Sequence, residues 1–205
     1  MITTPQRYFK RLFDLVIVIL SIPFILFPVL LLTLIAMIDT REWGIFSQQR
    51  IGQHGLPFKI YKIKTLAVRT GIGGTRENGP SSYGHFLRRS KLNELPQLYN
   101  VLKGDMSLVG PRPDLPGFAD ALKGKDQIIL KVKPGLTGLA SLKYRHEDDI
   151  LARQPNPEEY NRTIIWVDKV KINRNYIQNY TFYLDLSILL KSILNQPYTD
   201  DKHHG

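Results

Sequence analysis

The polarity of the chain changes sharply after its first forty residues. Residues 15–38 run for 24 positions without a charged side chain, LVIVILSIPFILFPVLLLTLIAMI. An uncharged apolar run of about 18 or more residues is typical of a helix that enters a membrane. At about 1.5 Å per residue, such a helix reaches roughly 36 Å, which is long enough to cross the hydrocarbon layer. The pattern therefore predicts a membrane segment near the N-terminus.

Two prolines inside this run disfavour a straight helix. Pro23 and Pro28 each lack a backbone N–H and crowd the carbonyl four residues earlier. Ser21 is able to bond back to the carbonyl of Ile17 and bend the helix further. The carbonyls that lose their partners are costly to leave in lipid.

Both flanks of the apolar run are basic, and basic flanks prefer the cytoplasmic side. The positive side chains on the two flanks are Arg7, Lys10, Arg11, Arg41 and Arg50. A helix that breaks near Ser21 and Pro23 and returns to the same face keeps both flanks in the cytoplasm. An ordinary kinked spanning helix is the alternative, and the residues alone leave both open.

Alternating polar and apolar positions follow the membrane segment. Residues 45–66, IFSQQRIGQHGLPFKIYKIKTL, predict two strands joined by a Gly-Gln-His-Gly turn. The second strand carries Lys59, Lys62 and Lys64 between apolar residues, so we expect a half-buried strand with a basic side. Residues 69–84 are rich in Gly, Ser and polar residues and predict a loop that serves as a linker or lid.

A short amphipathic helix is expected in NELPQLYNVLKGDMSLVGPRP, residues 93–113. Asn93 is a favourable N-cap, and Gly104 is a natural stop. Glu94 would then lie at a helix N-terminus, where unpaired N–H groups favour its charged form. Arg112 lies between two prolines, and a guanidinium held in this way suits bidentate binding of phosphate.

The last third of the chain contains a turn cluster and a second amphipathic segment. Residues 133–139, KPGLTGL, form the turn cluster, and Arg145 follows in LKYRHE. Residues 177–194, IQNYTFYLDLSILLKSIL, predict an aromatic-rich helix with a lone acid at Asp185. Its aromatic side chains suit either a membrane interface or a core. Residues 196–205 are a polar tail.

Composition narrows the range of partners. The 205 residues suffice for one modest core and carry a net charge of +10, from 28 Lys and Arg against 18 Asp and Glu. This surplus suits nucleic acid, anionic lipid or a phosphorylated substrate. No Arg- and Lys-dense recognition helix or aromatic stacking motif is evident, so we expect no nucleic acid partner. The chain has no cysteine, which excludes disulfides and thiolate metal sites.

Four segments together resemble one family. They are FKIYKIKTL, RRSKLNELPQLYNVLKGDMSLVGPRP, KPGLTGLASL with Arg145, and LDL at 184–186. The chain resembles the bacterial sugar transferases, which are monotopic phosphoglycosyl transferases, from its apolar segment to about residue 194. The resemblance implies an enzyme that moves a sugar-1-phosphate from a nucleotide-diphosphate sugar to a polyprenyl phosphate such as undecaprenyl phosphate. Nucleoside monophosphate is released, and assembly of an exopolysaccharide, capsule, O-antigen or glycoconjugate begins.

The resemblance also implies an α+β fold in three parts. Residues 1–40 would be a re-entrant membrane helix-break-helix, with the break at Ser21 and Pro23. Residues 41–195 would be a small cytoplasmic domain that contains the β-hairpin and interface-lying amphipathic helices, and residues 196–205 its tail. The protein would be monotopic in the bacterial inner membrane, in contact with its lipid, with downstream glycosyltransferases as candidate partners. We expect a chain of this length to be the minimal form of the family, and its sugar and oligomeric state stay open.

The same resemblance assigns site residues. It implies that Asn93 and Glu94 are the catalytic pair and that Glu94 binds Mg²⁺. It also implies a set of basic residues that bind the substrate phosphates: Lys59, Arg88, Arg112 and Arg145. Members of the family usually carry an Asp-Glu dyad at this position, and the Asp is understood as the nucleophile that forms a phospho-sugar intermediate.

Asn93 puts the covalent mechanism in question, because an amide is neutral, poorly nucleophilic and a weak magnesium ligand. Three explanations stay open. In a natural variant, Glu94 or the lipid phosphate attacks, and Asp114 and Asp120 supply charge to the metal. Alternatively, the chain carries an engineered Asp-to-Asn substitution. In the third case it is a pseudoenzyme that binds substrate or serves as an assembly scaffold.

Overall fold

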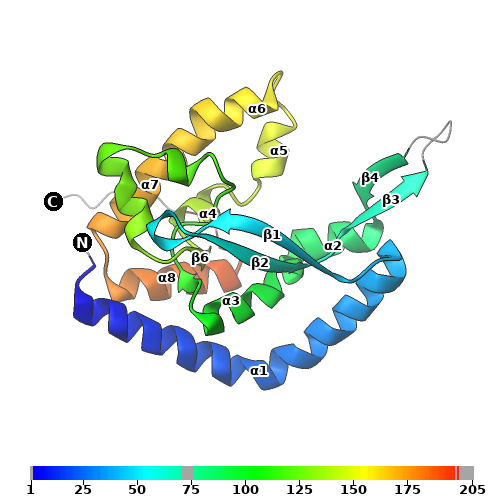
Figure 1. Cartoon of the computed structure of the whole chain (residues 1–205), viewed down its shortest axis with the longest axis horizontal. Helices are drawn as coiled ribbons and strands as arrows, with labels where there is room; N and C mark the ends of the chain where they lie inside the picture. The colour runs from blue at the N-terminus through cyan, green and yellow to red at the C-terminus, as the bar shows by residue number, and fades with distance from the viewer. Residues whose placement is uncertain (1, 71–75, 197, 199–205) are drawn as a thin grey trace.

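A long bent helix lies along one side of a mixed body of short strands and helices (Figure 1). The computed structural model describes residues 2–70, 76–196 and 198. Within these residues the strands form three two-stranded sheets. This arrangement agrees with the predicted α+β class, with a long apolar helix at the N-terminus.

The long helix, α1 (Thr4–Thr40), is continuous and contains both prolines. Figure 1 shows that α1 bends near its middle, as expected where a proline interrupts the hydrogen-bond ladder. The Ser21 hydroxyl donates to the carbonyl of Val18 at 2.8 Å, and not to that of Ile17 as predicted. The expected break at Ser21 and Pro23 is therefore a bend inside one helix, because the flanking turns keep their helical backbone.

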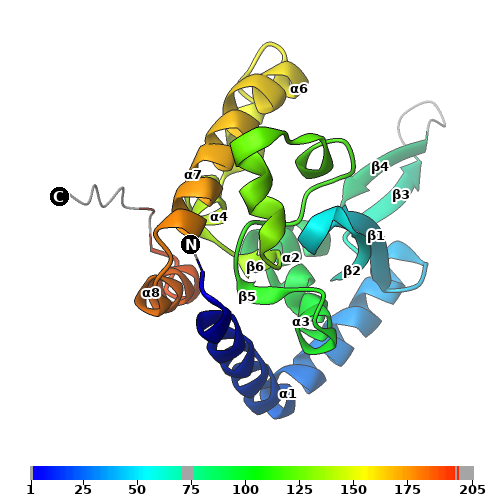
Figure 2. The same cartoon turned by 60° about the vertical axis from the view of Figure 1, so that its left-hand side comes forward.

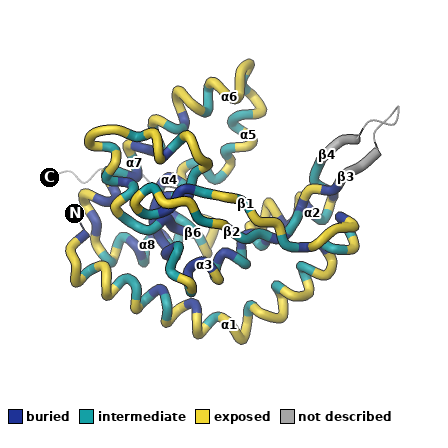
Figure 3. Tube along the Cα trace, in the orientation of Figure 1, coloured by how far each residue is buried: buried dark blue, intermediate teal, exposed yellow. Residues whose placement is uncertain are grey.

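Most of the surface of α1 is exposed and apolar (Figure 3). Phe24 is 79% exposed and Ile38 is 80% exposed. Among the described residues, α1 is the one helix that is long and apolar enough to cross a membrane. Such a surface is costly in water, so α1 is suited to association with lipid.

Buried polar contacts hold the N-terminal half of α1 to the body, where α8 (Phe182–Ile193) lies beside it (Figure 2). Asp14 is 2% exposed and accepts hydrogen bonds from the Ser107 hydroxyl at 2.7 Å and the Leu108 N–H at 3.1 Å. Lys10 forms an ion pair with Asp185 of α8. These contacts fix the N-terminal half of the helix to the body. The Tyr83 hydroxyl, which donates to the Leu32 carbonyl at 2.6 Å, fixes its C-terminal half.

The predicted first hairpin is confirmed. β1 (Ile45–Ile51) pairs antiparallel with β2 (Pro57–Ile63), and a 3₁₀ turn, η1 (Gln53–Gly55), joins them. A second hairpin was missed: β3 (Leu66–Thr70) pairs with β4 (Arg76–Pro80), largely within residues 69–84, which were predicted as a loop. The hydrogen bonds between two strands join backbone groups, so Gly-rich and polar segments are also able to form a hairpin. The tip, residues 71–75, lies outside the described residues.

The central segment begins differently from the prediction. η2 (Leu92–Gln97) is a 3₁₀ helix that starts after Lys91, and α3 (Leu98–Lys103) continues it. Asn93 lies inside η2 and is 8% exposed, so the prediction that it is an N-cap was wrong. Lys91 adopts a left-handed backbone with φ of 60° and turns the chain from the preceding helix before Asn93 is reached. Gly104 ends α3 at φ 95°, as predicted.

The predicted C-terminal helix is divided in two. α7 (Trp166–Gln178) ends before Tyr180, and α8 begins after Thr181, whose hydroxyl accepts from the Leu184 N–H at 3.1 Å. An N-cap residue has an extended backbone, which is why one helix does not run through this point. Tyr180 is 7% exposed and belongs to the core, whereas Tyr183 is 82% exposed.

The remaining elements complete the body around one main core. β5 (Ser107–Val109) and β6 (Gly135–Thr137) pair in parallel at its centre. The other elements are α2 (Ser82–Ser90), η3 (Ala119–Ala121), η4 (Gly124–Lys131), α4 (Leu139–Lys143), α5 (Glu147–Leu151), α6 (Pro157–Tyr160) and the π-helix η5 (Asn161–Ile165). Buried side chains from β2, β5, α1, α3, η4, α4, α7 and α8 form most of this core.

Candidate functional site

Three segments bring charged side chains together around Glu94. Glu94 lies on η2, Lys62 on β2, and Arg112 in the loop that follows β5. Lys62 Nζ donates to Glu94 Oε1 at 2.9 Å. Arg112 Nη1 donates to Glu94 Oε2 at 3.2 Å, and its Nη2 donates to Oε1. The structure thus places Glu94, a predicted catalytic residue, in direct contact with Arg112, a predicted phosphate-binding residue.

The local sequence explains how the arginine reaches the acid. The loop that carries Arg112 begins at Gly110, whose N–H donates to the Thr137 carbonyl at 2.9 Å. A Cβ at Gly110 would lie 2.7 Å from the carbonyl oxygen of Lys133, closer than such atoms approach. Only glycine allows this close packing of the loop against β6. Pro111 and Pro113 then restrict the backbone on both sides of the guanidinium.

The two cations control the ionisation of Glu94, which is 8% exposed. Burial acts to raise the pKa of its carboxyl, but Arg112 and Lys62 outweigh burial and hold the pKa well below the usual 4.5. Burial lowers the pKa of Lys62, and Glu94 opposes that shift. Glu94 is therefore an ionised acceptor at neutral pH. Arg50 also interacts with Glu94 electrostatically, so Lys62, Arg112 and Arg50 together carry more charge than this single carboxylate.

Sequence reasoning missed Lys62 and Arg50 as members of this site. Lys62 lies two residues after Ile60, which is 2% exposed, so both point to the same face of β2. This alternation is the signal that could have distinguished Lys62 from Lys59. Arg50 donates to the Gln48 side chain at 2.8 Å, and its Nε is buried without a partner among the described residues. No pattern in the sequence singles out Arg50.

The other three predicted phosphate-binding residues lie elsewhere. Lys59 is exposed on β2, and Arg88 is exposed in the last turn of α2. Arg145 donates to the Asn195 side chain beyond the end of α8. Within the described part of the chain, none of the three hydrogen-bonds to Glu94. Their contact with a substrate stays a prediction.

Few oxygen ligands are available for a metal. The described residues contain no group of three or more His, Cys, Asp or Glu side chains arranged to hold an ion. Asn93 Oδ1 is buried beside Glu94 and has no hydrogen-bond partner among the residues described. Mg²⁺ in phosphoryl-transfer sites commonly takes one or two protein ligands, with substrate phosphates and water completing its shell. Asn93 Oδ1 and the Glu94 carboxylate are the oxygen atoms that could hold such an ion, and the ion would compete with Lys62 and Arg112 for the carboxylate.

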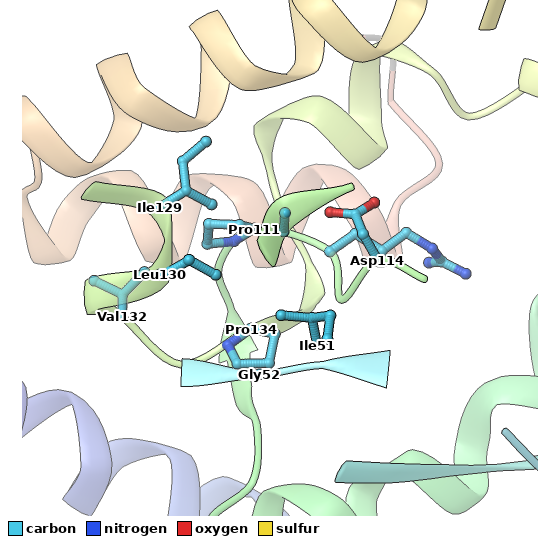
Figure 4. A pocket seen from close by; sticks show the side chains of 10 residues that line it. Ile51, Gly52, Pro111, Asp114, Ile129, Leu130, Val132 and Pro134 are labelled. Atoms are coloured by element: carbon cyan, nitrogen blue, oxygen red, sulfur yellow. The ribbon is translucent and has the colours of Figure 1, made fainter. Parts of the chain in front are cut away.

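A cavity of about 180 Å³ opens beside Arg112. Asp114, two residues further along, borders both this cavity and a smaller, mostly apolar one, whose wall also includes Ile51, Pro111 and Ile129 (Figure 4). Burial raises the pKa of Asp114 to about 7, although Lys169, Arg50 and Arg112 oppose the shift. The residues that line the larger cavity are Arg50, Arg112, Pro113, Asp114, Leu115, Phe118, Glu147, Asn161, Trp166 and Lys169.

Known proteins resemble this chain over almost its whole length. The family model described as "Bacterial sugar transferase" matches residues 5–196. A protein of Bacillus subtilis (strain 168) named "Uncharacterized sugar transferase EpsL" is 34% identical over 189 residues, which cover 90% of this chain and 85% of that protein.

Two longer relatives have names that state an activity. "UDP-glucose:undecaprenyl-phosphate glucose-1-phosphate transferase" of Klebsiella pneumoniae is 34% identical over 196 residues, covering 90% of this chain and 39% of that protein. "Undecaprenyl-phosphate galactose phosphotransferase" of Salmonella typhimurium is 31% identical over 209 residues, covering 91% of this chain and 40% of that protein. The chain therefore spans less than half the length of these two relatives.

Proposed function

The chain belongs to the bacterial sugar transferase family, and from this premise we propose that it transfers a sugar-1-phosphate from a nucleotide-diphosphate sugar to a polyprenyl phosphate. Undecaprenyl phosphate is the proposed acceptor, because the names of two relatives include it. A uridine-diphosphate sugar is the proposed donor for the same reason. Nucleoside monophosphate is released, and the lipid-linked sugar begins the assembly of a polysaccharide or glycoconjugate.

One observation carries this proposal: the Glu94 carboxylate occupies a partly buried site between Lys62 and Arg112. A phosphate presents oxygens to a guanidinium much as a carboxylate does, so a donor pyrophosphate is able to compete with Glu94 for Arg112. The surplus of positive charge favours such a dianion over the single carboxylate. Phosphoryl transfer depends mainly on this kind of positioning and charge neutralisation.

The proposed reaction is a direct displacement at the phosphorus that bears the sugar. An oxygen of the polyprenyl phosphate forms a bond to this phosphorus, and the bond to the bridging oxygen breaks. The bridging oxygen leaves with its electron pair on the nucleoside monophosphate. Arg112 and Lys62 stabilise the charge on the phosphate oxygens, while Glu94 orients both cations. Asn93 does not attack, because an amide is a poor nucleophile.

Mg²⁺ is the proposed cofactor, with Glu94 and Asn93 Oδ1 as the protein atoms that would hold it. When bound, the ion would supply further positive charge to the pyrophosphate oxygens. The buried Asn93 oxygen without a partner supports this assignment, since such an atom is costly to leave unpaired.

The proposed location is the inner face of the bacterial cytoplasmic membrane. The bend in α1 supports a re-entrant path, in which both ends of the helix stay on the cytoplasmic side. α8 lies beside α1 and exposes Tyr183 and Ile193, which are 82% and 77% exposed. Aromatic and aliphatic side chains of this kind suit the boundary between headgroups and acyl chains.

A turnover assay tests the proposed function. The purified chain would be incubated with undecaprenyl phosphate, Mg²⁺ and a panel of uridine-diphosphate sugars. We expect release of uridine monophosphate and formation of a lipid-linked sugar pyrophosphate with at least one donor. Release that does not depend on the lipid phosphate, or no release with any donor, would favour the alternative of a binding protein or assembly scaffold that is catalytically impaired at Asn93.

A further inference from the structure

The cavity beside Arg112 has the features of a binding site for one ring of the donor. Its volume of about 180 Å³ is below the roughly 300–1,000 Å³ of pockets that enclose a drug-sized ligand, so it suits a part of a nucleotide sugar. Arg112 both contacts Glu94 and lines the cavity. A phosphate held by Arg112 would therefore lie at the edge of the cavity, and a ring bonded to that phosphate would be close enough to enter it.

The cavity wall combines an aromatic surface with hydrogen-bonding groups. Phe118 and Trp166 pack edge to face, with ring centroids 5.3 Å apart. Glu147 Oε2 accepts from Lys169 Nζ at 2.5 Å, and both side chains line the cavity. The backbone of Asp114 is held at its carbonyl, which accepts from the Ile51 N–H at 2.9 Å. The site is thus built from positioned side chains.

Two polar groups in this wall have no hydrogen-bonded side-chain partner among the described residues, although Lys169, Arg50 and Arg112 act on the Asp114 carboxyl electrostatically. Neither the Asp114 carboxyl nor the Asn161 amide makes a side-chain hydrogen bond to another of the described residues. Their oxygens are free to accept hydrogen bonds from a ligand in the cavity.

A π-helical turn brings Asn161 to the cavity. The Trp166 N–H bonds to the Asn161 carbonyl five residues earlier, in the π turn η5. In an α-helix, residues five apart point in directions about 140° apart, since each residue turns by about 100°. The wider π turn places them closer to one face, and both side chains line the cavity. Such turns are rare and are often found at functional sites.

We propose that this cavity binds the sugar ring of the donor, and that Asp114 and Asn161 determine which sugar is accepted. The inference rests on the proposed function. A sugar ring presents several hydroxyl donors and an apolar face, which match the acceptor oxygens and the Trp166 ring. A pyrimidine base presents a single ring N–H donor, so it matches the same wall less well. The sugar is also bonded directly to the reacting phosphorus, which Arg112 is proposed to hold.

Equilibrium binding separates the sugar from the rest of the donor. Uridine monophosphate, UDP-glucose, UDP-galactose and UDP-N-acetylgalactosamine would be titrated into the full chain in detergent. The variants are Asn161→Ala and Asp114→Asn. The matched controls are Thr163→Ala, on the exposed side of the same π turn, and Asp148→Asn, exposed on α5 outside the cavity. Thermal unfolding would show that each variant is folded.

We expect the variants to weaken only the part of the binding affinity that the sugar contributes. Both cavity variants should weaken binding of the preferred UDP-sugar by about tenfold, as for the loss of one hydrogen bond to a buried group, and reduce the preference among donors. The affinity for uridine monophosphate should change less than about twofold, and the controls should match the wild type. Asn161→Ala removes a partly exposed side chain, so it stays informative even if Asp114→Asn unfolds the protein.

Three results would overturn the inference. They are an equal loss for uridine monophosphate and all donors, unchanged binding in both variants, and a wild type that binds no UDP-sugar more tightly than uridine monophosphate. The proposed function is judged separately by turnover. A wild type that discriminates among UDP-sugars without transferring any of them would contradict the proposed function alone.

Discussion

Arg112 holds Glu94 with two hydrogen bonds from one guanidinium, although 18 residues separate them in sequence. Nη1 reaches Oε2 at 3.2 Å, and Nη2 reaches Oε1. Lys62 adds a third hydrogen bond to Oε1 at 2.9 Å. The Arg112 side chain is 39% exposed, so removing one partner should cost less than the about 3–5 kcal/mol typical of a fully buried pair, because water screens the charge that is left. The pair is therefore a sensitive point for both stability and the proposed chemistry.

The guanidinium of Arg112 should not be replaceable by an ammonium. Arg112→Lys keeps the charge but offers a point donor in place of a planar fork. We expect kcat/KM for the nucleotide sugar to fall by about tenfold or more, with the change measured as initial rates of nucleoside monophosphate release. Arg89→Lys, an exposed change on α2, is the matched control. Equal rates for Arg112→Lys and the wild type would show that no bidentate contact to phosphate is needed.

Asn93→Asp tests the proposed direct displacement. If the lipid phosphate attacks directly, a carboxylate at this position brings no new step, and we expect less than about a tenfold change in turnover. We also expect no labelled protein after incubation with donor labelled in its sugar phosphate and no acceptor. A gain of orders of magnitude, together with a trapped phospho-sugar intermediate, would show instead that Asn93 stands where a nucleophile is required.

Asp114 should make stability depend on pH in a defined direction. Its pKa is raised from 3.8 to about 7, so between these values the folded state binds a proton that the unfolded state has lost. The stabilising contribution is present below pH 3.8 and is lost as pH rises toward and through 7. Because asparagine does not ionise, Asp114→Asn abolishes this loss of stability with rising pH. We expect the Tm of the variant, relative to wild type, to be higher at pH 8 than at pH 5, and a difference that is independent of pH would contradict the assignment.

The absence of cysteine from the chain allows a direct test of membrane topology. Thr4→Cys and Trp43→Cys place single thiols at exposed positions near the two ends of α1. A re-entrant helix should let a membrane-impermeant thiol reagent label both from the cytoplasmic side in inverted vesicles. Labelling of the two positions from opposite sides would establish a helix that spans the bilayer.

Features with a strong local signal were predicted from the sequence. The uncharged run predicted α1, alternation around the Gly-Gln-His-Gly turn predicted β1 and β2, and Gly104 marked the end of α3. Glu94 and Arg112, which were assigned to the site separately, are in contact. Each of these predictions depends on residue type and spacing, which a single sequence displays.

The features that were missed depend on tertiary context. The left-handed Lys91 moved the helix start away from Asn93, which no cap preference reveals. Lys62 joins Glu94 because β2 packs against η2, and Arg50 faces the same charges from β1. The π turn at Asn161 has the composition of an ordinary helix, so no residue type in it marks the turn.

Release of nucleoside monophosphate by Glu94→Gln tests the central claim most directly. The amide keeps the size of the side chain but removes the charge that orients Lys62 and Arg112. With undecaprenyl phosphate and the donor that the wild type prefers, we expect release to fall by at least about a hundredfold. The folded state would be verified by thermal unfolding. A folded Glu94→Gln variant that releases nucleoside monophosphate at the wild-type rate would contradict the account.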